Sequence, residues 1–306
     1  MTIQQLRYIS ALNTHRNFVK AADACSVSQP TLTMQLKKLE NEMGLTIFDR
    51  SKQPLTPTPT GVEVIQRANE ILHNTEQLFE FIRGQHESIS GQFKLGIIPT
   101  LAPYLLPKFL PSFLNENELV EPTIEELQTQ TIINRLKEGS LDVGLLATPL
   151  NEPGIREIKL FYEPFYLYGE AAKVRTMDDA SNLPDEELLL LEEGHCFRSQ
   201  TLEVCKQTAN DKQQFHYRSG SIESLKSLVQ QGLGYTLVPA MSVTDFDKPY
   251  LAFFKAPQPA REISLVVHSS FVKEKLLETL RENIIRNVPE EFQAVENYSN
   301  VRWRQL

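Results

Sequence analysis

Two of the three cysteines lie close together in the chain and have the residue types for sulfur chemistry. Eight residues separate Cys196 from Cys205, with His195 directly before Cys196 and Arg198 two positions after it. The thiolate is the reactive form of cysteine, and neighbouring cationic groups stabilise it. The spacing alone is weak evidence, because most cysteines of this kind are buried thiols that only fill space. We expect Cys25 to be such a packing residue.

The sequence after residue 91 alternates between apolar strands and helices, and these elements must position the two thiols. Strands are predicted at residues 93–98, 124–127, 141–147, 165–168, 188–191, 215–218, 235–238 and 263–267. Helices are predicted at 104–110, 131–137, 196–209 and 221–231, and from 271 onward. The alternation favours two Rossmann-like α/β subdomains with parallel sheets. One consists of residues 91–163 and 268–306, the other of 164–267.

Two threonines fall just after predicted strands. Ligands of such folds bind outside the carboxyl ends of the strands, which is where Thr100 and Thr129 stand. Threonines at such positions commonly do no more than cap the next helix. Their position therefore singles them out without giving them a ligand.

The first sixty residues have the pattern of a helix-turn-helix. Helices are predicted over 3–15 and 18–25, followed by a turn and a third helix. Ser28 is placed to cap that third helix, and Pro30 fits its first turn, where backbone amides lack intrahelical partners. Its apolar residues recur at helical spacing and predict a buried stripe of Leu32, Leu36, Leu39 and Met43.

The outward positions of this third helix are candidates for reading DNA. Their side chains are small or flexible and carry hydrogen-bonding groups, as insertion into the major groove requires. Gln29, Thr31 and Thr33 are the better candidates for contacts with bases, whereas Lys37 suits a phosphate. The complete set of predicted DNA contacts is Ser28, Gln29, Pro30, Thr31, Thr33, Lys37 and Arg50.

A β-wing is predicted next. Gly44 ends the third helix, and the extended segments 45–48 and 54–56 are joined by a basic turn. Arg50 and Lys52 lie in this turn. We expect Arg50 to contact phosphate or the minor groove rather than to be an ordinary solvated side chain.

A long linker helix follows over residues 60–90. Thr60 and Glu63 have the spacing of a capping box that would begin it. Residues three and four apart then form a heptad seam: Ile65, Ala68, Leu72, Thr75, Phe79 and Ile82. Such a seam packs either on the chain's own body or on a second copy. We favour pairing with a second copy, because a DNA reader needs two half-sites.

Composition and charge limit the class of protein. The 306 residues are enough for two or three domains, and with 41% hydrophobic and 23% charged residues the chain is of the soluble globular type. Residues 1–60 carry seven Lys and Arg against four Asp and Glu, a net charge of +3. Because the whole chain has a net charge of −8, residues 61–306 carry −11. A basic head on an acidic body suits docking of one end on DNA, although +3 is within ordinary variation.

Location and cofactors follow from what the sequence lacks. The start has no signal-peptide pattern, and no stretch reaches the ~18 apolar residues of a membrane span. Three cysteines do not make a secreted disulfide framework, so we expect a cytoplasmic protein without membrane contact. Six histidines without HExxH or paired CxxC motifs give no reason to expect a metal, and no cofactor is expected.

Over nearly its whole length the chain resembles the LysR-type transcription regulators. The resemblance rests on Phe18, Ala21, Ala22, Val27 to Thr33, Leu36, Leu39, Glu40, Gly44, Phe48 to Arg50, Leu55, Thr56, Thr60 and Gly61. It implies a winged helix-turn-helix over 1–59, a dimerising linker helix over 60–90 and a periplasmic-binding-protein-like effector domain over 91–306. It further implies a homodimer through the linker helix, a homotetramer on double-stranded promoter DNA in the nucleoid, and contact with RNA polymerase.

Within this family the cysteine segment resembles the peroxide-sensing OxyR branch. The matching residues are Glu193 to Arg198, Val204, Cys205, Ile98 to Thr100, Pro103 to Pro107, Gln128, Thr129 and Arg261. The resemblance implies that hydrogen peroxide is the effector and controls oxidative-stress genes. It implies that Cys196 attacks peroxide and that Cys205 then resolves the product into a disulfide.

The same resemblance assigns supporting roles. His195 and Arg261 would stabilise the Cys196 thiolate, whose pKa we expect below the ordinary value near 8.5. Thr100 and Thr129 would hold the peroxide. His195 has an alternative as a plain hydrogen-bond donor to the backbone.

Geometry would make the cysteine pair a switch. If the segment between them is helical, a rise of ~1.5 Å per residue puts the two α-carbons roughly 13 Å apart. A disulfide needs them within about 7 Å, so the helix would have to unwind. Such a covalently driven change is a means of turning one dimer against another.

Two other functions compete with this interpretation. A metabolite-sensing LysR-type regulator would bind its effector between the subdomains, with Ser221 and Thr100 in the cleft. It would keep its response in Cys196→Ser. A thiol peroxidase would instead consume peroxide over many turnovers, but the DNA-reading head disfavours an enzyme.

Overall fold

The structure is a computed structural model that describes residues 1–83, 89–170, 187–194, 196–205 and 220–301, without the side chains of 73, 76, 77, 79–83 and 295. The chain divides into two compact units at about residue 86, and each is described by itself. The predicted strand at 215–218 and the end of the helix predicted over 196–209 lie outside the described residues.

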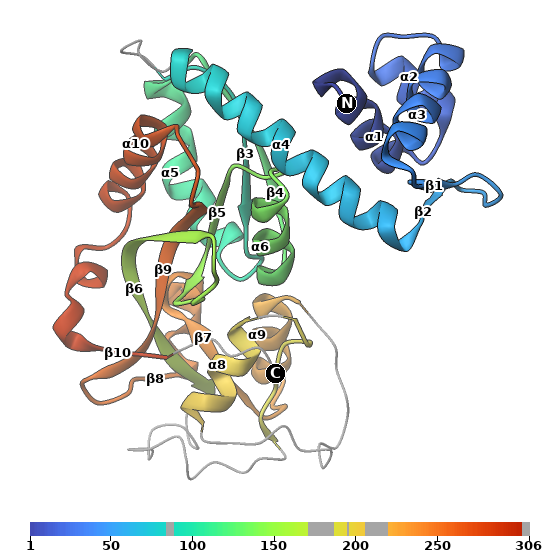
Figure 1. Cartoon of the computed structure of the whole chain (residues 1–306). Coiled ribbons are helices and arrows are strands. Elements are labelled where there is room, and N and C mark those ends of the chain that lie inside the picture. The colour runs from blue at the N-terminus through green and yellow to red at the C-terminus, as the bar shows by residue number, and fades with distance from the viewer. Residues whose placement is uncertain (84–88, 171–186, 195, 206–219, 302–306) are drawn as a thin grey trace. The chain divides into compact units, whose positions relative to one another are not determined.

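The first unit contains the predicted helix-turn-helix (Figure 1): α1 (Ile3–His15), α2 (Phe18–Ala24) and α3 (Gln29–Met43). Its core joins the inward residues of α1 to Leu32, Leu36 and Leu39 of α3, as predicted. The exception is Met43, which is 37% exposed because it lies in the last turn, beyond the packed part of the helix.

The two ends of α3 are closed as the sequence indicates. The Ser28 hydroxyl accepts the Thr31 amide at 3.3 Å, and Pro30 lies in the first turn. Gly44 follows with φ of 66°, a left-handed conformation that ends the helix at little steric cost. Local signals thus set where α3 begins and ends.

The wing strands are shorter than predicted and shifted by about two residues. β1 (Phe48–Asp49) pairs antiparallel with β2 (Thr56–Pro57). The buried carboxylate of Glu40 accepts the amides of Ile47, at 2.8 Å, and Phe48, at 3.4 Å. Because the amides of Ile47 and Phe48 bond to Glu40 of α3, β1 begins at Phe48 and not at the predicted residue 45.

The long helix α4 (Pro59–Arg83) begins with a different cap from the one predicted. The hydroxyl of Thr58, and not that of Thr60, accepts the amide of Gly61 at 2.9 Å. Pro59 is the first residue of α4, a position that suits proline. Thr60 therefore lies inside the first turn, and the predicted capping box with Glu63 does not form.

Half of the predicted heptad seam packs within the first unit. Ile65 and Ala68 are buried in the core of the helix-turn-helix, and Leu72 packs against it. Ile71 and Leu78, off the predicted seam, are 39% and 59% exposed. Packing on the chain's own body therefore accounts for the first part of the seam, and pairing with a second copy stays a prediction.

The second unit has a mixed sheet instead of the two parallel sheets predicted. β3 (Gly91–Ile97) pairs in parallel with β4 (Val120–Glu126) and β5 (Val143–Thr148). β6 (Ile155–Gly169) and β9 (Gln258–His268) then run antiparallel to each other, and β5 pairs antiparallel with β9. The order is β4-β3-β5-β9-β6-β7.

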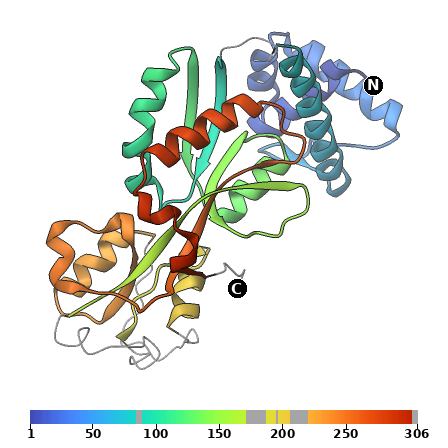
Figure 2. The same cartoon turned by 90° about the vertical axis from the view of Figure 1, so that its left-hand side faces the viewer.

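The long strands β6 and β9 run through both subdomains (Figure 2). The first subdomain adds α5 (Ala102–Glu116), α6 (Thr129–Lys137) and α10 (Glu274–Arg286). The second adds α8 (Cys196–Val204), α9 (Ile222–Gln230), β7 (Tyr235–Pro239) and β8 (Leu251–Ala252). Short 3-10 turns follow β7 and α10, at Ala240–Ser242 (η3), Asp245–Tyr250 (η4), Glu290–Gln293 (η5) and Val295–Asn297 (η6), and β10 (Tyr298–Asn300) pairs with β9.

Each subdomain has its own apolar core. The first core includes Phe93, Leu105, Phe109, Ile132, Leu145, Ile263 and Leu280. The second core includes Phe165, Leu191, Leu202, Leu225, Leu237 and Val301. β6 contributes residues to both cores, and β9 contributes to the first core and pairs with β6 along most of its length.

Candidate functional site

The two cysteines lie at opposite ends of one helix and in different cores. Cys196 begins α8, and Cys205 directly follows its last residue. Both are free thiols, 2% and 0% exposed. Cys196 packs into the first core although the rest of α8 belongs to the second, whereas Cys205 lies in the second core. The nine helical residues correspond to about 13 Å of rise between the cysteine α-carbons.

A fully buried arginine stands beside the Cys196 end of α8. The Arg261 guanidinium lies 5.7 Å from the ring centre of Phe197, the neighbour of Cys196. Its Nη1 donates to Thr100 Oγ1 at 2.8 Å and its Nη2 to the Thr100 carbonyl at 3.0 Å. Arg261 therefore ties the loop after β3 to the start of α8.

Glu163 neutralises this arginine. Glu163 and Arg261 are cross-strand neighbours on β6 and β9, and both are 0% exposed. Arg261 Nε donates to Glu163 Oε2 at 2.8 Å, and Nη2 lies 2.7 Å from the same oxygen. A buried charge requires such a partner. Glu163 was not predicted from the sequence. Its signal was an acidic residue that stands alone inside the apolar run around residues 160–168.

Thr129 approaches the thiol from the start of α6. It is 1% exposed, and its hydroxyl acts to lower the pKa of Cys196 against the effect of burial. Within the described part of the chain, Thr129 Oγ1 has no partner at hydrogen-bond distance. A buried hydroxyl that makes no hydrogen bond beside a thiol is a suitable place for a small polar molecule.

The electrostatics of Cys196 differ from our expectation of a lowered pKa. Burial raises the pKa of the Cys196 thiol, and the opposing effects of Arg261 and the Thr129 hydroxyl do not cancel it. Burial alone raises the pKa of Cys205 to about 12. The physical reason is that removing the thiolate from water costs more free energy than its attraction to Arg261 recovers, since Arg261 is already paired with Glu163.

The residues flanking Cys196 have separate roles. His195 lies outside the described residues. Arg198 donates to the Leu191 carbonyl at 2.9 Å, so its guanidinium has a structural contact rather than the expected one with the thiolate. Gly194 has φ of 92°, and a side chain there would lie 2.8 Å from the Gln128 side chain. Only glycine fits this turn into α8 without strain.

Both hydroxyls of the metabolite alternative have other partners. Ser221 Oγ accepts the Ser224 amide at 3.4 Å and caps α9. The Thr100 hydroxyl is held by Arg261. These contacts give the two side chains structural roles in the described state.

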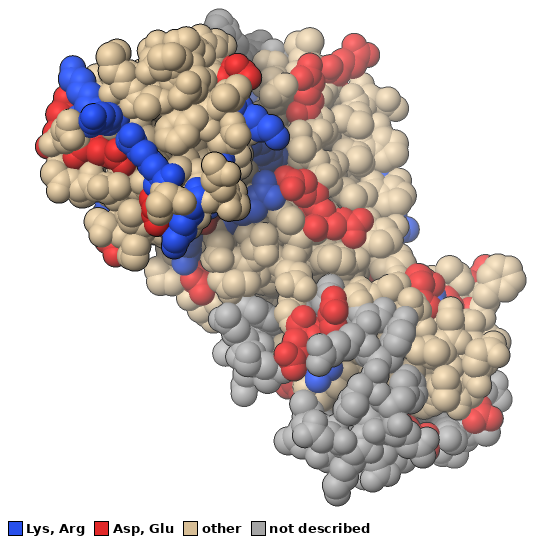
Figure 3. Space-filling view, turned by 90° about the vertical axis from the view of Figure 1, so that its right-hand side faces the viewer, with Lys and Arg blue, Asp and Glu red and all other residues tan. Residues whose placement is uncertain are grey.

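On the first unit, the predicted DNA contacts lie at the outer side of α3. Ser28, Gln29, Pro30 and Lys37 are exposed, and Thr31 and Thr33 are half-buried. Ser28 Oγ lies 2.8 Å from Thr31 Oγ1, and Gln29 Nε2 donates to Thr33 Oγ1 at 3.0 Å. Lys and Arg side chains gather in a band over this unit (Figure 3).

Arg50 was predicted to contact DNA, but in the structure it pairs with a residue of its own unit. Its Nη2 lies 2.6 Å from Oε2 of Glu40, the buried carboxylate that holds β1. The Arg50 side chain remains 39% exposed. Its first role here is to compensate a buried charge, while Lys52 is 64% exposed beside Asp49.

The described residues hold neither a metal-binding cluster nor a membrane-spanning helix. The ranges set out above contain no group of three or more His, Cys, Asp or Glu suited to hold a metal ion. No helix among the described residues has the length and apolar character needed to cross a membrane.

Comparison with known proteins places the chain. Residues 3–62 match the model of bacterial regulatory helix-turn-helix proteins of the lysR family, and residues 86–288 match the LysR substrate binding domain. The hydrogen peroxide-inducible genes activator of Pectobacterium carotovorum is 36% identical, over 93% of this chain and 97% of its own. The DNA-binding transcriptional dual regulator OxyR of Escherichia coli K12 is 35% identical, over 96% of this chain and 98% of its own.

Solved structures agree with the sequence matches. A full-length OxyR variant from Pseudomonas aeruginosa is similar with a TM-score of 0.78 and 33% identity, covering 94% of this chain and 99% of its own. A hydrogen peroxide-bound OxyR variant from Corynebacterium glutamicum has a TM-score of 0.61 and 30% identity, covering 100% and 98%. The chain therefore belongs to the LysR family of bacterial regulatory helix-turn-helix proteins, in its OxyR branch.

Proposed function

We propose that this protein is a transcription regulator that senses hydrogen peroxide through Cys196 and Cys205. The observation that carries the proposal is the position of two free, buried thiols at opposite ends of α8, one in each core. The similarity to hydrogen peroxide-inducible genes activators supports the choice of oxidant.

The proposed reaction has two steps. The Cys196 thiolate attacks one peroxide oxygen, the O–O bond breaks, and hydroxide leaves while the sulfur becomes a sulfenic acid. The Cys205 sulfur then attacks the sulfenic sulfur and water leaves, so the two thiols are oxidised together to a disulfide and peroxide is reduced. Arg261 and Thr129 favour the thiolate against the cost of burial. Thr100, held by Arg261, and Thr129 would orient the peroxide, and His195 would assist from the residue before the thiol.

The disulfide acts as a signal because the helix prevents it from forming in place. Cysteine α-carbons about 13 Å apart must approach within about 7 Å, so α8 has to unwind. In addition, Cys196 must leave the first core or Cys205 the second. Loss of packing in one subdomain is then available to change contacts between subunits.

The output of the switch is DNA binding by the first unit. We propose that Gln29, Thr31 and Thr33 contact bases and that Ser28, Pro30 and Lys37 border the phosphates of double-stranded promoter DNA. Arg50 reaches DNA only if its guanidinium serves Glu40 and a phosphate together. The proposed assembly is a homodimer through α4, arranged in tetramers in the cytoplasm and acting with RNA polymerase on oxidative-stress genes.

The test is mass spectrometry of the peroxide-treated full chain. We expect a peptide crosslink between Cys196 and Cys205, with loss of two hydrogens, and recovery of the free thiols on reduction. Cys205→Ser should stop at a trapped sulfenic acid, and Cys196→Ser should show neither product nor a change in promoter binding. A Cys196→Ser variant that still responds to peroxide would contradict the proposal.

A further inference from the structure

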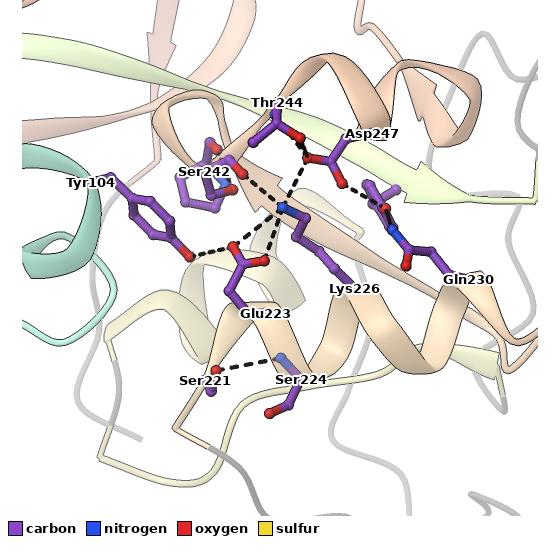
Figure 4. Close-up of polar contacts among 11 residues, drawn as sticks. Tyr104, Ser221, Glu223, Ser224, Lys226, Gln230, Ser242, Thr244 and Asp247 are labelled. Carbon is purple, nitrogen blue, oxygen red and sulfur yellow. Dashed lines mark hydrogen bonds and ion pairs between the residues drawn. The ribbon is translucent and has the colours of Figure 1, made fainter.

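A chain of polar contacts links the start of α5 to the second subdomain (Figure 4). The Tyr104 hydroxyl, on α5, donates to Glu223 Oε1, on α9, at 2.8 Å. Lys226 Nζ lies 3.2 Å from Glu223 and donates to the Ser242 carbonyl at 2.8 Å. Lys226 is buried and also lies 2.9 Å from the buried Asp247. This cluster is a firm anchor for the Tyr104 hydroxyl.

The residue beside Ser242 continues the chain back to the thiol site. The Met241 amide donates to Glu163 Oε1 at 2.9 Å. Glu163 Oε2 holds Arg261, and Arg261 holds both the side chain and the carbonyl of Thr100. Thr100 lies four residues before Tyr104, in the loop that leads into α5, so the contacts form a closed ring.

At Tyr104 the ring of contacts passes from the first subdomain to the second without using the long strands β6 and β9. α5 packs in the first core, through Leu105 and Phe109, whereas α9 belongs to the second core. The aromatic ring of Tyr104 packs against the second core, independently of its hydroxyl. Burial and the hydrogen bond to Glu223 raise the pKa of Tyr104, so its hydroxyl remains protonated and donates to Glu223.

We propose that Tyr104 is a positioning residue for the reaction of Cys196 with peroxide. Its hydroxyl, bonded to Glu223, holds the first turn of α5 in place, and so keeps Thr100 and Arg261 at the thiol. This inference rests on the proposed function, because it concerns the rate of the same reaction. The Glu223 side chain is 57% exposed. The Tyr104–Glu223 bond therefore contributes the free energy of one ordinary, partly hydrated hydrogen bond.

The decisive variant is Tyr104→Phe, which removes the hydroxyl and keeps the packed ring. We expect the second-order rate constant of Cys196 with hydrogen peroxide to fall roughly three- to ten-fold, the range of one net hydrogen bond. We also expect the pH profile of Cys196 alkylation by iodoacetamide to move to higher pH. The reason is that Arg261, the charged group acting on Cys196, would hold its position less closely.

Tyr168→Phe is the matched control. The Tyr168 hydroxyl donates to Asp247 at 2.8 Å and accepts from Gln230 at 2.7 Å. It belongs to the same polar cluster but lies outside the closed ring. We expect it to lower the melting temperature as Tyr104→Phe does, while leaving the peroxide rate and the alkylation profile unchanged.

Variants of Glu223 separate the hydrogen bond from the charge. Glu223→Gln keeps an acceptor for Tyr104 and should react within about two-fold of the parent, whereas Glu223→Ala should behave like Tyr104→Phe. The double variant of Tyr104→Phe and Glu223→Ala should react no more slowly than either single variant, because both single variants remove the same Tyr104–Glu223 hydrogen bond.

The outcomes distinguish this inference from the proposed function. A parent chain in which peroxide leaves Cys196 unmodified would overturn the proposed function and this inference with it. A reactive parent chain whose Tyr104→Phe variant keeps the same rate and profile would overturn the inference alone. The same holds if Tyr168→Phe slows the reaction equally.

Discussion

At the scale of single residues, Cys196 combines a reactive position with a protonated resting form. Burial outweighs Arg261 and Thr129, so the pKa of Cys196 is raised. A raised pKa means that only a small share of the thiol is ionised at neutral pH. The resting sensor is therefore protected from slow oxidation, and its speed with peroxide depends on how the site treats the small thiolate fraction.

This charge balance predicts the pH dependence of the reaction. Because peroxide reacts with the thiolate, the observed rate of Cys196 oxidation should climb as pH rises from 6 to 9, about ten-fold per unit while the thiol remains mostly protonated. Stopped-flow measurement of sulfenic acid in Cys205→Ser gives this profile. A plateau that begins below neutral pH would show instead that the pKa is lowered.

Arg261→Gln tests the cause of that profile. Loss of the positive charge should raise the pKa of Cys196 further, so the rate at pH 7 should drop at least ten-fold and the profile should move to higher pH. Lys159→Gln is a control, because this mostly exposed lysine pairs with Glu262 outside the thiol site. Equal effects of the two changes would mean that Arg261 acts on fold stability only.

At the scale of elements, local signals were sufficient where a helix begins or ends. The bounds of α1, α3 and α9 follow from caps and apolar spacing, and Ser28 and Gly44 serve as predicted. The long strands β6 and β9 were not predicted in full, because their pairing joins residues about a hundred positions apart. Apolar runs at 165–168 and 263–267 indicated only parts of them.

The site shows the same division between local and distant information. The positions of Cys196, Thr100, Thr129 and Arg261 followed from a family resemblance, and the fold brings them together. Glu163 was missed because its importance comes from facing Arg261 across two strands. The direction of the Cys196 pKa was also missed, since burial cannot be read from the neighbouring residues in sequence.

We expect Glu40 to stabilise the wing. Its carboxylate accepts two buried amides and pairs with Arg50, so Glu40→Ala would leave all three without their partner. We expect a loss of about 2–4 kcal/mol in the unfolding free energy of the first unit, measured by urea denaturation. Glu42→Ala, an exposed neighbour, should change it by less than about 0.5 kcal/mol. Equal losses for both would disprove the role of Glu40.

At the scale of the whole molecule, charge separates the two ends of the chain. Residues 1–60 carry +3 within a protein of net charge −8. Such a distribution favours the first unit over the acidic remainder for docking on phosphate. In the proposed function, the thiol switch and the DNA-binding output therefore belong to different units.

Lys37 tests the output end. Lys37→Ala should weaken binding to all DNA sequences alike and reduce the slope of log affinity against log salt by about one, as loss of a phosphate contact requires. Lys108→Ala, an exposed lysine of the second unit, should change neither quantity. A loss confined to one operator sequence would instead make Lys37 a reader of bases.

Hydrogen exchange of α8 tests the central claim most directly, namely that the disulfide cannot form without unwinding this helix. The amides of residues 196–204 should be protected in the reduced chain and should lose that protection after stoichiometric peroxide, with Cys205→Ser remaining protected after the same treatment. A disulfide-bonded chain in which these amides exchange as slowly as in the reduced form would contradict the account.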